Sequence, residues 1–290
     1  MSLPIFVHIP KTAGSTLRTL ITANYAPSEV LSLYGDPKEI LIRAAAHIGK
    51  TKSYRLVQGH TPYGTHRFIG LQQARYLTFL RDPIDRFLSD IAHAIRHADH
   101  GFHGVVGAPG LTMKQRISNA LDINYYRNNM VQYVSGSFST EPISLTHLGT
   151  AIDNLWNSEF IGLTEQFESS LLMMAKLLGW KTIIPQRLNV RPDKEELLTP
   201  ELKTNLNRAL AYDRMLYEVG QEHFTQKCRA YGSLLHEAAI ELAGIIKEQD
   251  IDYPNAKWDI YEVGQPTLVP LQNYNRRIKP NTPLHRWLYD

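Results

Sequence analysis

Cysteine is almost absent from this chain of 290 residues, because Cys228 is the single one. No intrachain disulfide can therefore form, and an oxidising compartment is not implied. Apolar runs are short, and none approaches the roughly 18 residues that a membrane-spanning helix needs. Residues 1–7 lack both a basic start and a long apolar stretch, so no signal peptide is expected. These absences predict a soluble protein of a reducing compartment, the cytoplasm.

Charge of one sign is not in large excess. Lys and Arg total 31 against 28 Asp and Glu, which leaves a net charge of +3. So small an excess suits one local site for an anion, and it does not predict a surface that coats nucleic acid. A composition of 43% hydrophobic and 20% charged residues is that of a globular protein, which excludes collagen, coiled coil and disorder.

Short apolar runs alternate with segments of helical periodicity. The runs predict strands over residues 3–9, 54–58, 75–80 and 159–163. The periodicity predicts helices that begin after residue 16 and over residues 37–48, 83–97, 145–156, 165–178 and 200–226, with further helical stretches within 113–134. We therefore expect an α/β fold: a P-loop-like parallel sheet flanked by helices, with a mostly helical C-terminal half.

The composition changes toward the C-terminus. Residues 1–226 are expected to form the main domain, and residues 227–248 one further helix. Five prolines within residues 250–290 predict irregular structure there, although the aromatic residues of this segment predict that it packs on the main domain. The chain is accordingly divided into 1–226 and a C-terminal extension, 227–290.

The turn after the first predicted strand has the residues of an anion site. It reads Lys11-Thr12-Ala13-Gly14-Ser15-Thr16 and leads into a predicted helix. A helix start presents unpaired backbone N–H groups, to which this turn adds two hydroxyl donors and an ammonium group. A plain turn whose hydroxyls cap the helix is the alternative. The lysine precedes the small residues, unlike in G-x-x-x-x-G-K-[S/T], which disfavours an ATPase or an ordinary kinase.

Two further strand ends carry residues of the same kind. Arg81 follows the strand that ends at Leu80, and Ser89 lies about two helical turns later. An arginine and a serine hydroxyl together can hold a phosphate, although Arg81 pairing with a carboxylate is the simpler alternative. His60 follows the strand that ends at Gln58, so it is a candidate general base, or else an ordinary loop histidine.

These motifs, in this order, resemble those of sulfotransferases that use 3′-phosphoadenosine-5′-phosphosulfate (PAPS). The similarity is greatest to the branch that contains the heparan-sulfate 2-O- and 6-O-sulfotransferases and many bacterial relatives. It covers about residues 5–225 and includes three weaker stretches, at 128–136, 160–167 and 212–217. Many relatives have two glycines where Ala13-Gly14 stands, and the membrane anchor of the animal enzymes is not visible.

The resemblance implies a role for each matching residue. Residues 11–16 would hold the 5′-phosphosulfate, Arg81 and Ser89 the 3′-phosphate, and Arg191 would close over the nucleotide. His60 would act as general base and Lys11 would stabilise charge on the leaving oxygen. The expected activity is sulfuryl transfer from PAPS to a hydroxyl, on a carbohydrate or glycoconjugate, in a bacterial cytoplasm. No metal is required, and the product is adenosine-3′,5′-bisphosphate.

Other interpretations of the chain remain open. A different nucleotide-dependent transferase, such as a small-molecule kinase, and a non-catalytic nucleotide-binding module are the alternative functions. A cluster of four histidines, His93, His97, His100 and His103, suggests a zinc site, but no H-E-x-x-H pattern is present. We expect no metal there and instead place this segment near the acceptor pocket.

Overall fold

A five-stranded parallel sheet forms the centre of the computed structural model, which describes residues 2–35, 37–137, 142–183, 198–252 and 278–290. The strands are β1 (Pro4–Val7), β2 (Val30–Leu33), β3 (Leu56–Gly59), β4 (Arg75–Leu80) and β5 (Phe160–Leu163). Their order across the sheet is β2-β3-β1-β4-β5, and every neighbouring pair is parallel. The predicted fold class, with helices around a parallel sheet and a helical C-terminal half, is confirmed.

The register of the strands brings their carboxyl ends level. Val7 of β1 is opposite Gly59 of β3 on one side and Thr78 of β4 on the other. Leu33, the last residue of β2, is opposite the same Gly59. Residues that follow these strands therefore emerge at one edge of the sheet, which is where ligands bind in open parallel α/β folds.

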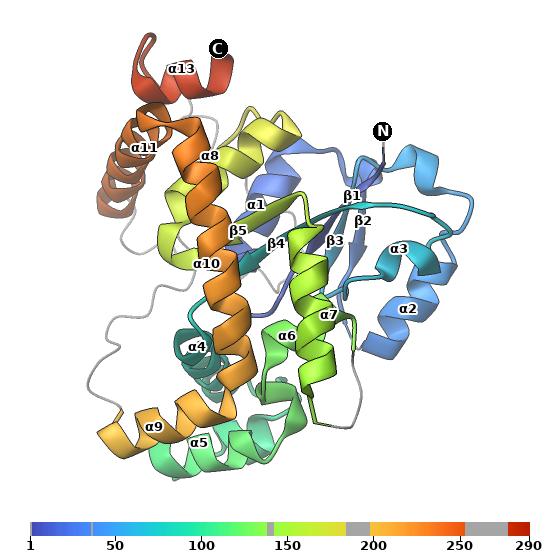
Figure 1. The fold of residues 1–290 in the computed structure, drawn as a ribbon, viewed down its shortest axis with the longest axis vertical. Helices are drawn as coiled ribbons and strands as arrows, with labels where there is room; N and C mark the ends of the chain where they lie inside the picture. The colour runs from blue at the N-terminus through green and yellow to red at the C-terminus, as the bar shows by residue number, and fades with distance from the viewer. Residues whose placement is uncertain (1, 36, 138–141, 184–197, 253–277) are drawn as a thin grey trace.

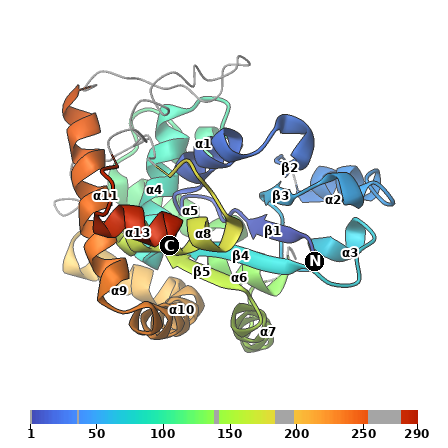
Figure 2. The same cartoon turned by 90° about the horizontal axis from the view of Figure 1, so that it is seen from above.

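Helices cover both faces of the sheet. The N-terminal half contributes α1 (Gly14–Asn24), α2 (Pro37–Ala45), α3 (Thr65–Phe68), α4 (Pro83–Arg96), α5 (Met113–Leu121) and α6 (Asn129–Ser135). The C-terminal half contributes α7 (Leu145–Trp156), α8 (Phe167–Leu178), α9 (Pro200–Ala209), α10 (Ala211–Tyr231), α11 (Ser233–Asp252) and α13 (Pro283–Tyr289). Figure 2 shows α1 and α7 on opposite sides of the sheet, and Figure 1 shows the long α10 running from α9 to α11.

Several elements differ from the sequence-based prediction. The strand β2 was not predicted, and the continuous helix expected over 200–226 is wrong, because the chain breaks at Leu210 into α9 and α10. Leu210 lies outside helical geometry, with φ −107° and ψ 22°, while its side chain is buried. The helix expected to begin at 227 begins instead at Ser233, since Gly232 ends α10 with a φ of 72°.

The C-terminal segment is more regular than its prolines suggested. Pro283 is at the start of α13, where its missing N–H costs nothing, and the Thr282 hydroxyl caps that helix. Trp287 is buried, and its indole N–H donates to the Leu172 carbonyl in α8 at 3.0 Å. The helix α13 therefore packs on α8, and α10 runs continuously across residue 226. The division into two domains stays a prediction.

No helix within the described ranges has the length and apolar content needed to cross a bilayer.

Candidate functional site

The turn between β1 and α1 has a backbone shaped by two left-handed residues. Lys11 has a φ of 71° and Ala13 a φ of 65°, a conformation that non-glycine residues rarely adopt. The Thr12 side chain is fully buried, and its hydroxyl donates to the Ile9 carbonyl at 2.8 Å. Thr12 therefore holds the turn together through its side chain, and only its backbone remains to face a ligand.

The start of α1 has no side-chain cap. Its N-cap residue is Ala13, which has no group to accept a hydrogen bond, whereas Asp82 caps α4 by accepting from two backbone N–H groups. Beside the uncapped start, the hydroxyls of Ser15 and Thr16 have no hydrogen-bond partner among the described residues and are half-buried. Uncapped N–H groups with adjacent hydroxyls are suited to an anion, which counts against the alternative that the hydroxyls only cap the helix.

Arg81 lies directly beside this turn. Its Nη1 donates to the Lys11 carbonyl at 3.0 Å, while its Nε is buried and has no partner among the described residues. The simpler alternative, an ion pair for Arg81, is not found in the described part of the chain, since Asp82 instead pairs with Arg214 at 2.7 Å. A buried guanidinium N–H without an acceptor indicates that an acceptor belongs there. Ser89, half-buried in the second turn of α4, stays a predicted partner of the same ligand.

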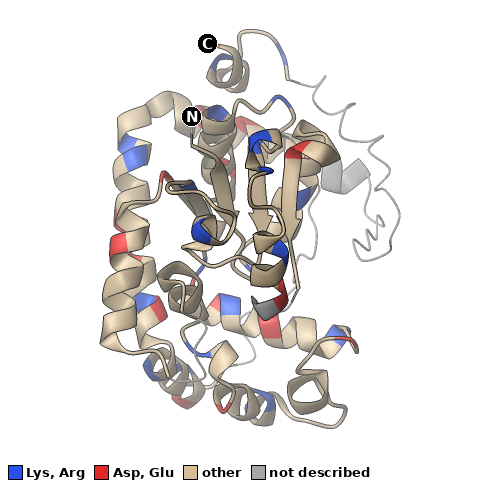
Figure 3. Cartoon of the chain, turned by 90° about the vertical axis from the view of Figure 1, so that its right-hand side faces the viewer, with Lys and Arg blue, Asp and Glu red and all other residues tan. Residues whose placement is uncertain are grey.

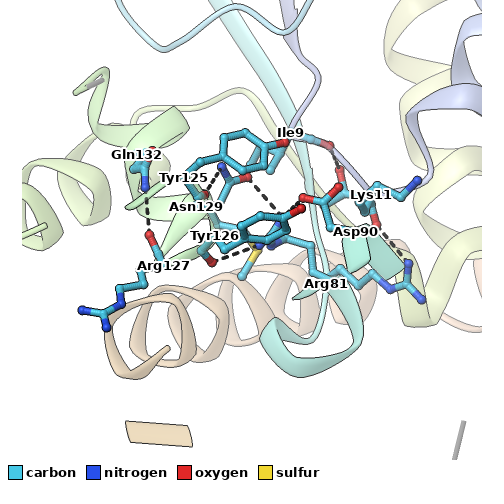
Figure 4. Close-up of polar contacts among 12 residues, drawn as sticks. Ile9, Lys11, Arg81, Asp90, Tyr125, Tyr126, Arg127, Asn129 and Gln132 are labelled. Carbon is cyan, nitrogen blue, oxygen red and sulfur yellow. Dashed lines mark hydrogen bonds and ion pairs between the residues drawn. The ribbon is translucent and has the colours of Figure 1, made fainter. Parts of the chain in front are cut away.

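The Lys11 ammonium is in an unusual electrostatic environment. Burial, opposed by Asp90 and assisted by the charges of Arg96, Arg81 and Arg86, lowers its pKa to about 8. Figure 4 shows Lys11, Arg81 and Asp90 grouped together. Figure 3 shows Lys and Arg interspersed with Asp and Glu over the elements of that view. The local excess of positive charge at Lys11 favours an anionic ligand.

A buried ion pair between Arg86 and Asp90 lies near Lys11. Arg86 is fully buried, and its Nη1 lies 3.5 Å from the Asp90 carboxylate and 3.3 Å from the side-chain oxygen of Asn129. Its Nη2 donates to the Tyr126 carbonyl at 3.4 Å. These contacts fix α4 against Tyr126 and against Asn129, the first residue of α6. Figure 4 shows Asp90, Tyr126 and Asn129. Sequence analysis missed Arg86 and Asp90, whose i,i+4 spacing in the predicted helix was the available signal.

His60 is at the end of β3, next to the end of β1. The backbone N–H of His8 donates to the Gly59 carbonyl at 2.9 Å, which ties the two strand ends together. A side chain on Gly59 would lie 1.9 Å from the Leu33 carbonyl oxygen, so only glycine fits. Burial lowers the pKa of His60 to about 4, helped by the positive charges of Arg18 and Lys11. His60 is therefore neutral at physiological pH and has a nitrogen that can accept a proton.

The sequence-predicted site residues converge as the strand order requires. β3, β1 and β4 are adjacent, and they deliver His60, Lys11 and Arg81 to one edge of the sheet. Arg191 lies outside the described residues. Two residues that the sequence analysis did not single out, His8 and Tyr34, complete the His60 side of the site, with ring centroids 4.7 Å and 5.0 Å from the His60 ring.

The three weaker motif stretches contact one another. The Asn128 side-chain oxygen accepts from the backbone N–H groups of Tyr212 and Asp213, at 3.1 Å and 3.0 Å. The Asp213 carboxylate in turn accepts from the first turn of α6. Glu165 accepts from the Asp82 backbone at 2.9 Å and from the Tyr217 hydroxyl at 2.8 Å. These bonds hold α6, α10 and the turn after β4, where Arg81 lies, in place relative to one another.

The four histidines of the cluster do not all turn toward one another. His93 and His97 lie with their ring centroids 4.2 Å apart and His100 is 5.5 Å from His93, but His103 turns away to bond the Ala94 carbonyl at 2.7 Å. Among the described residues, no three His, Cys, Asp or Glu side chains are grouped to hold a metal ion. His100, which follows the end of α4, lies beside Asp90, with 4.0 Å between its Nε2 and the carboxylate.

Comparison with known proteins gives one family. The model of the sulfotransferase family matches residues 5–211. Among solved structures, the chain is similar to mouse sulfotransferase SULT7A1 complexed with PAP, with 12% identity and a TM-score of 0.45 over 79% of this chain and 89% of that one. No curated protein matches.

Proposed function

Because this chain belongs to the sulfotransferase family, we propose that it transfers a sulfuryl group from PAPS to a hydroxyl of a carbohydrate or glycoconjugate. The observation that carries the choice of donor is the buried Arg81 Nε without an acceptor, adjacent to the uncapped start of α1. Two anion-binding elements on neighbouring strand ends suit a nucleotide with phosphate groups at both its 3′ and 5′ positions. The carbohydrate acceptor rests on the resemblance to heparan-sulfate sulfotransferases.

The residues present fit this donor. Arg81 and Ser89 would bind the 3′-phosphate, since a guanidinium fork and a hydroxyl are both donors. The backbone of residues 11–16, with the Ser15 and Thr16 hydroxyls, would bind the 5′-phosphosulfate, and Arg191 is the proposed residue that closes over the nucleotide. When bound, the nucleotide supplies the sulfuryl group and a 5′-phosphate leaving group.

In the transfer step, His60 accepts the proton of the acceptor hydroxyl as its oxygen attacks sulfur. The low pKa of His60 keeps its imidazole neutral for this role, and an anion bound nearby raises that pKa toward the working pH. Lys11 stabilises the charge that grows on the leaving oxygen, which is worth about 3–4 kcal/mol for a donor of this type. No residue in this scheme needs a metal, because positioning and fixed charges carry the reaction.

Ligand binding and an acceptor screen test the proposal. Thermal shift measurements should show stabilisation by adenosine-3′,5′-bisphosphate that exceeds the stabilisation by ATP. A panel of saccharides incubated with PAPS should yield one that gains the mass of a sulfonate. Preferred binding of ATP would favour a kinase, whereas tight bisphosphate binding with no product from any acceptor would favour a non-catalytic module.

Two variants separate the proposed roles. His60→Ala should lower turnover by about 10²–10⁴-fold and leave bisphosphate affinity nearly unchanged. Arg81→Ala should weaken bisphosphate binding, because it removes the group that faces the 3′-phosphate. Near-normal transfer by His60→Ala would show that another group takes the proton.

A further inference from the structure

His8 lies between the phosphate turn and the proposed base. Its side chain is 7% exposed, and its ring is stacked on Phe6 with centroids 6.0 Å apart. The ring also meets the His60 ring at 4.7 Å. On its other edge it faces α1, because a Cβ built on Gly14 would lie 1.6 Å from His8 Nε2. The His8 imidazole therefore contacts both the proposed base, His60, and the start of α1 at the phosphate turn. The distance between these two parts of the site decides the reaction geometry.

Tyr34 holds this imidazole from the end of β2. Its hydroxyl lies 3.1 Å from His8 Nδ1 and 3.5 Å from the Gln58 side-chain oxygen. The Gln58 amide nitrogen donates to the Ser32 hydroxyl at 3.2 Å, which turns the amide oxygen toward Tyr34. Since that oxygen can only accept, the Tyr34 hydroxyl donates to it and accepts from His8 Nδ1–H. His8 Nε2 is then an acceptor that faces the start of α1.

The Tyr34 ring is itself fixed. It packs edge-on against His60 with centroids 5.0 Å apart, and the Arg18 guanidinium lies over its ring at 4.9 Å. Arg18 belongs to α1, so the helix that begins at the phosphate turn also contacts the tyrosine. Burial, followed by the charges of His60, Lys11 and Arg18, lowers the pKa of His8, which keeps its ring neutral and able to make these contacts.

We propose that His8 and Tyr34 are positioning residues for sulfuryl transfer: hydrogen-bonded to each other, they set the His60 imidazole at a fixed place relative to the phosphate turn. This inference rests on the proposed function. Neither residue takes or gives a proton in the reaction. A displaced base lowers the rate without changing the groups that bind the nucleotide.

Tyr34→Phe tests the hydrogen bond, because it keeps the ring and removes the hydroxyl. The chain offers a matched control, Tyr54→Phe, whose hydroxyl lies 2.8 Å from His47 Nδ1 in a second His–Tyr pair. Tyr54 precedes β3 and is therefore at the opposite edge of the sheet from His60. Transfer is followed as release of adenosine-3′,5′-bisphosphate from PAPS with water as acceptor, and the bisphosphate Kd is measured by calorimetry.

We expect Tyr34→Phe to slow bisphosphate release about tenfold, with the Kd unchanged within about twofold. Tyr54→Phe should change neither quantity by more than about twofold. In ¹⁵N spectra of the imidazoles, the His60 signal should move in Tyr34→Phe and stay in place in Tyr54→Phe, a change that a loss of stability alone would not cause.

His8→Asn gives a second test, because its amide can still donate toward Tyr34 while the ring contact with His60 is lost. It should slow release by at least as much as Tyr34→Phe. An active wild-type chain in which Tyr34→Phe releases the bisphosphate as fast as Tyr54→Phe, or an unmoved His60 signal, overturns this inference alone. A wild-type chain that neither binds the bisphosphate nor releases it from PAPS overturns the proposed function instead.

Discussion

The affinity for the nucleotide should fall above neutral pH, because the Lys11 ammonium loses its proton unusually early. With a pKa of about 8, Lys11 is about nine-tenths protonated near pH 7 and about one-tenth protonated near pH 9. A bound anion stabilises the charged form of Lys11. At the higher pH, Lys11 must therefore regain its proton when the ligand binds, and the Kd should increase about tenfold between these two conditions.

The titration of Lys11 changes the measured Kd only if the interaction between the Lys11 charge and the ligand charge is large enough. A unit charge about 4 Å from an opposite charge is worth about 4 kcal/mol in a partly buried site. That is more than the roughly 1.4 kcal/mol that corresponds to a tenfold change, so the neutral form of Lys11 contributes little binding at the higher pH. The phosphate groups of the ligand have a second pKa near 6, and their charge is therefore nearly constant over this range.

Calorimetric titration with adenosine-3′,5′-bisphosphate at constant ionic strength measures the effect. Lys11→Arg is the control, since a guanidinium keeps its proton throughout this range and its Kd should change by less than about twofold. An unchanged Kd in the wild-type chain would refute the assignment of Lys11 to the ligand. An equal loss of affinity in Lys11→Arg would assign the pH dependence to another group.

Three substitutions test the structure around the site. Gly14→Ala should reduce transfer by more than about tenfold and lower the Tm, because its Cβ would overlap the His8 ring; unchanged kinetics would show that the ring moves aside. Ala13→Gly should stabilise the chain by about 0.5 kcal/mol in urea unfolding, since it relieves a left-handed residue; destabilisation would contradict this. Asn128→Ala should cost about 1–3 kcal/mol, because the buried backbone N–H of Asp213 and the partly buried one of Tyr212 lose their acceptor; a loss below about 0.5 kcal/mol would show that water replaces the amide.

The site residues that the sequence predicted are those at recognisable strand ends. Lys11, His60 and Arg81 each follow an apolar run, and the geometry of a parallel sheet then requires them to share an edge. Tyr34 was missed because β2 was missed: Val30–Leu33 is four residues long, with a serine on its exposed side. His8 was missed because it stands within the apolar run that predicted the first strand, and its position there indicated a buried strand residue rather than a site residue.

The helical boundaries were harder to predict for a different reason. The apolar spacing of residues 200–226 continues without interruption through Leu210, so periodicity alone does not show that the backbone leaves helical geometry there. Tertiary contacts decide this break, since Leu210 is buried in the cluster that packs around α4 and α5. At the C-terminus, the prolines predicted irregular structure, yet Pro283 begins a helix because it occupies the first position.

The spread of the site over the strand ends has a consequence for how the chain acquires activity. Residues as far apart in sequence as Lys11 and Glu165 contribute to one edge, and each parallel pairing closes a loop of 20 residues or more before it contributes any stability. Contacts of such long range make folding slow. During refolding from urea, the capacity to bind adenosine-3′,5′-bisphosphate should therefore return only in the last kinetic phase, together with completion of the sheet.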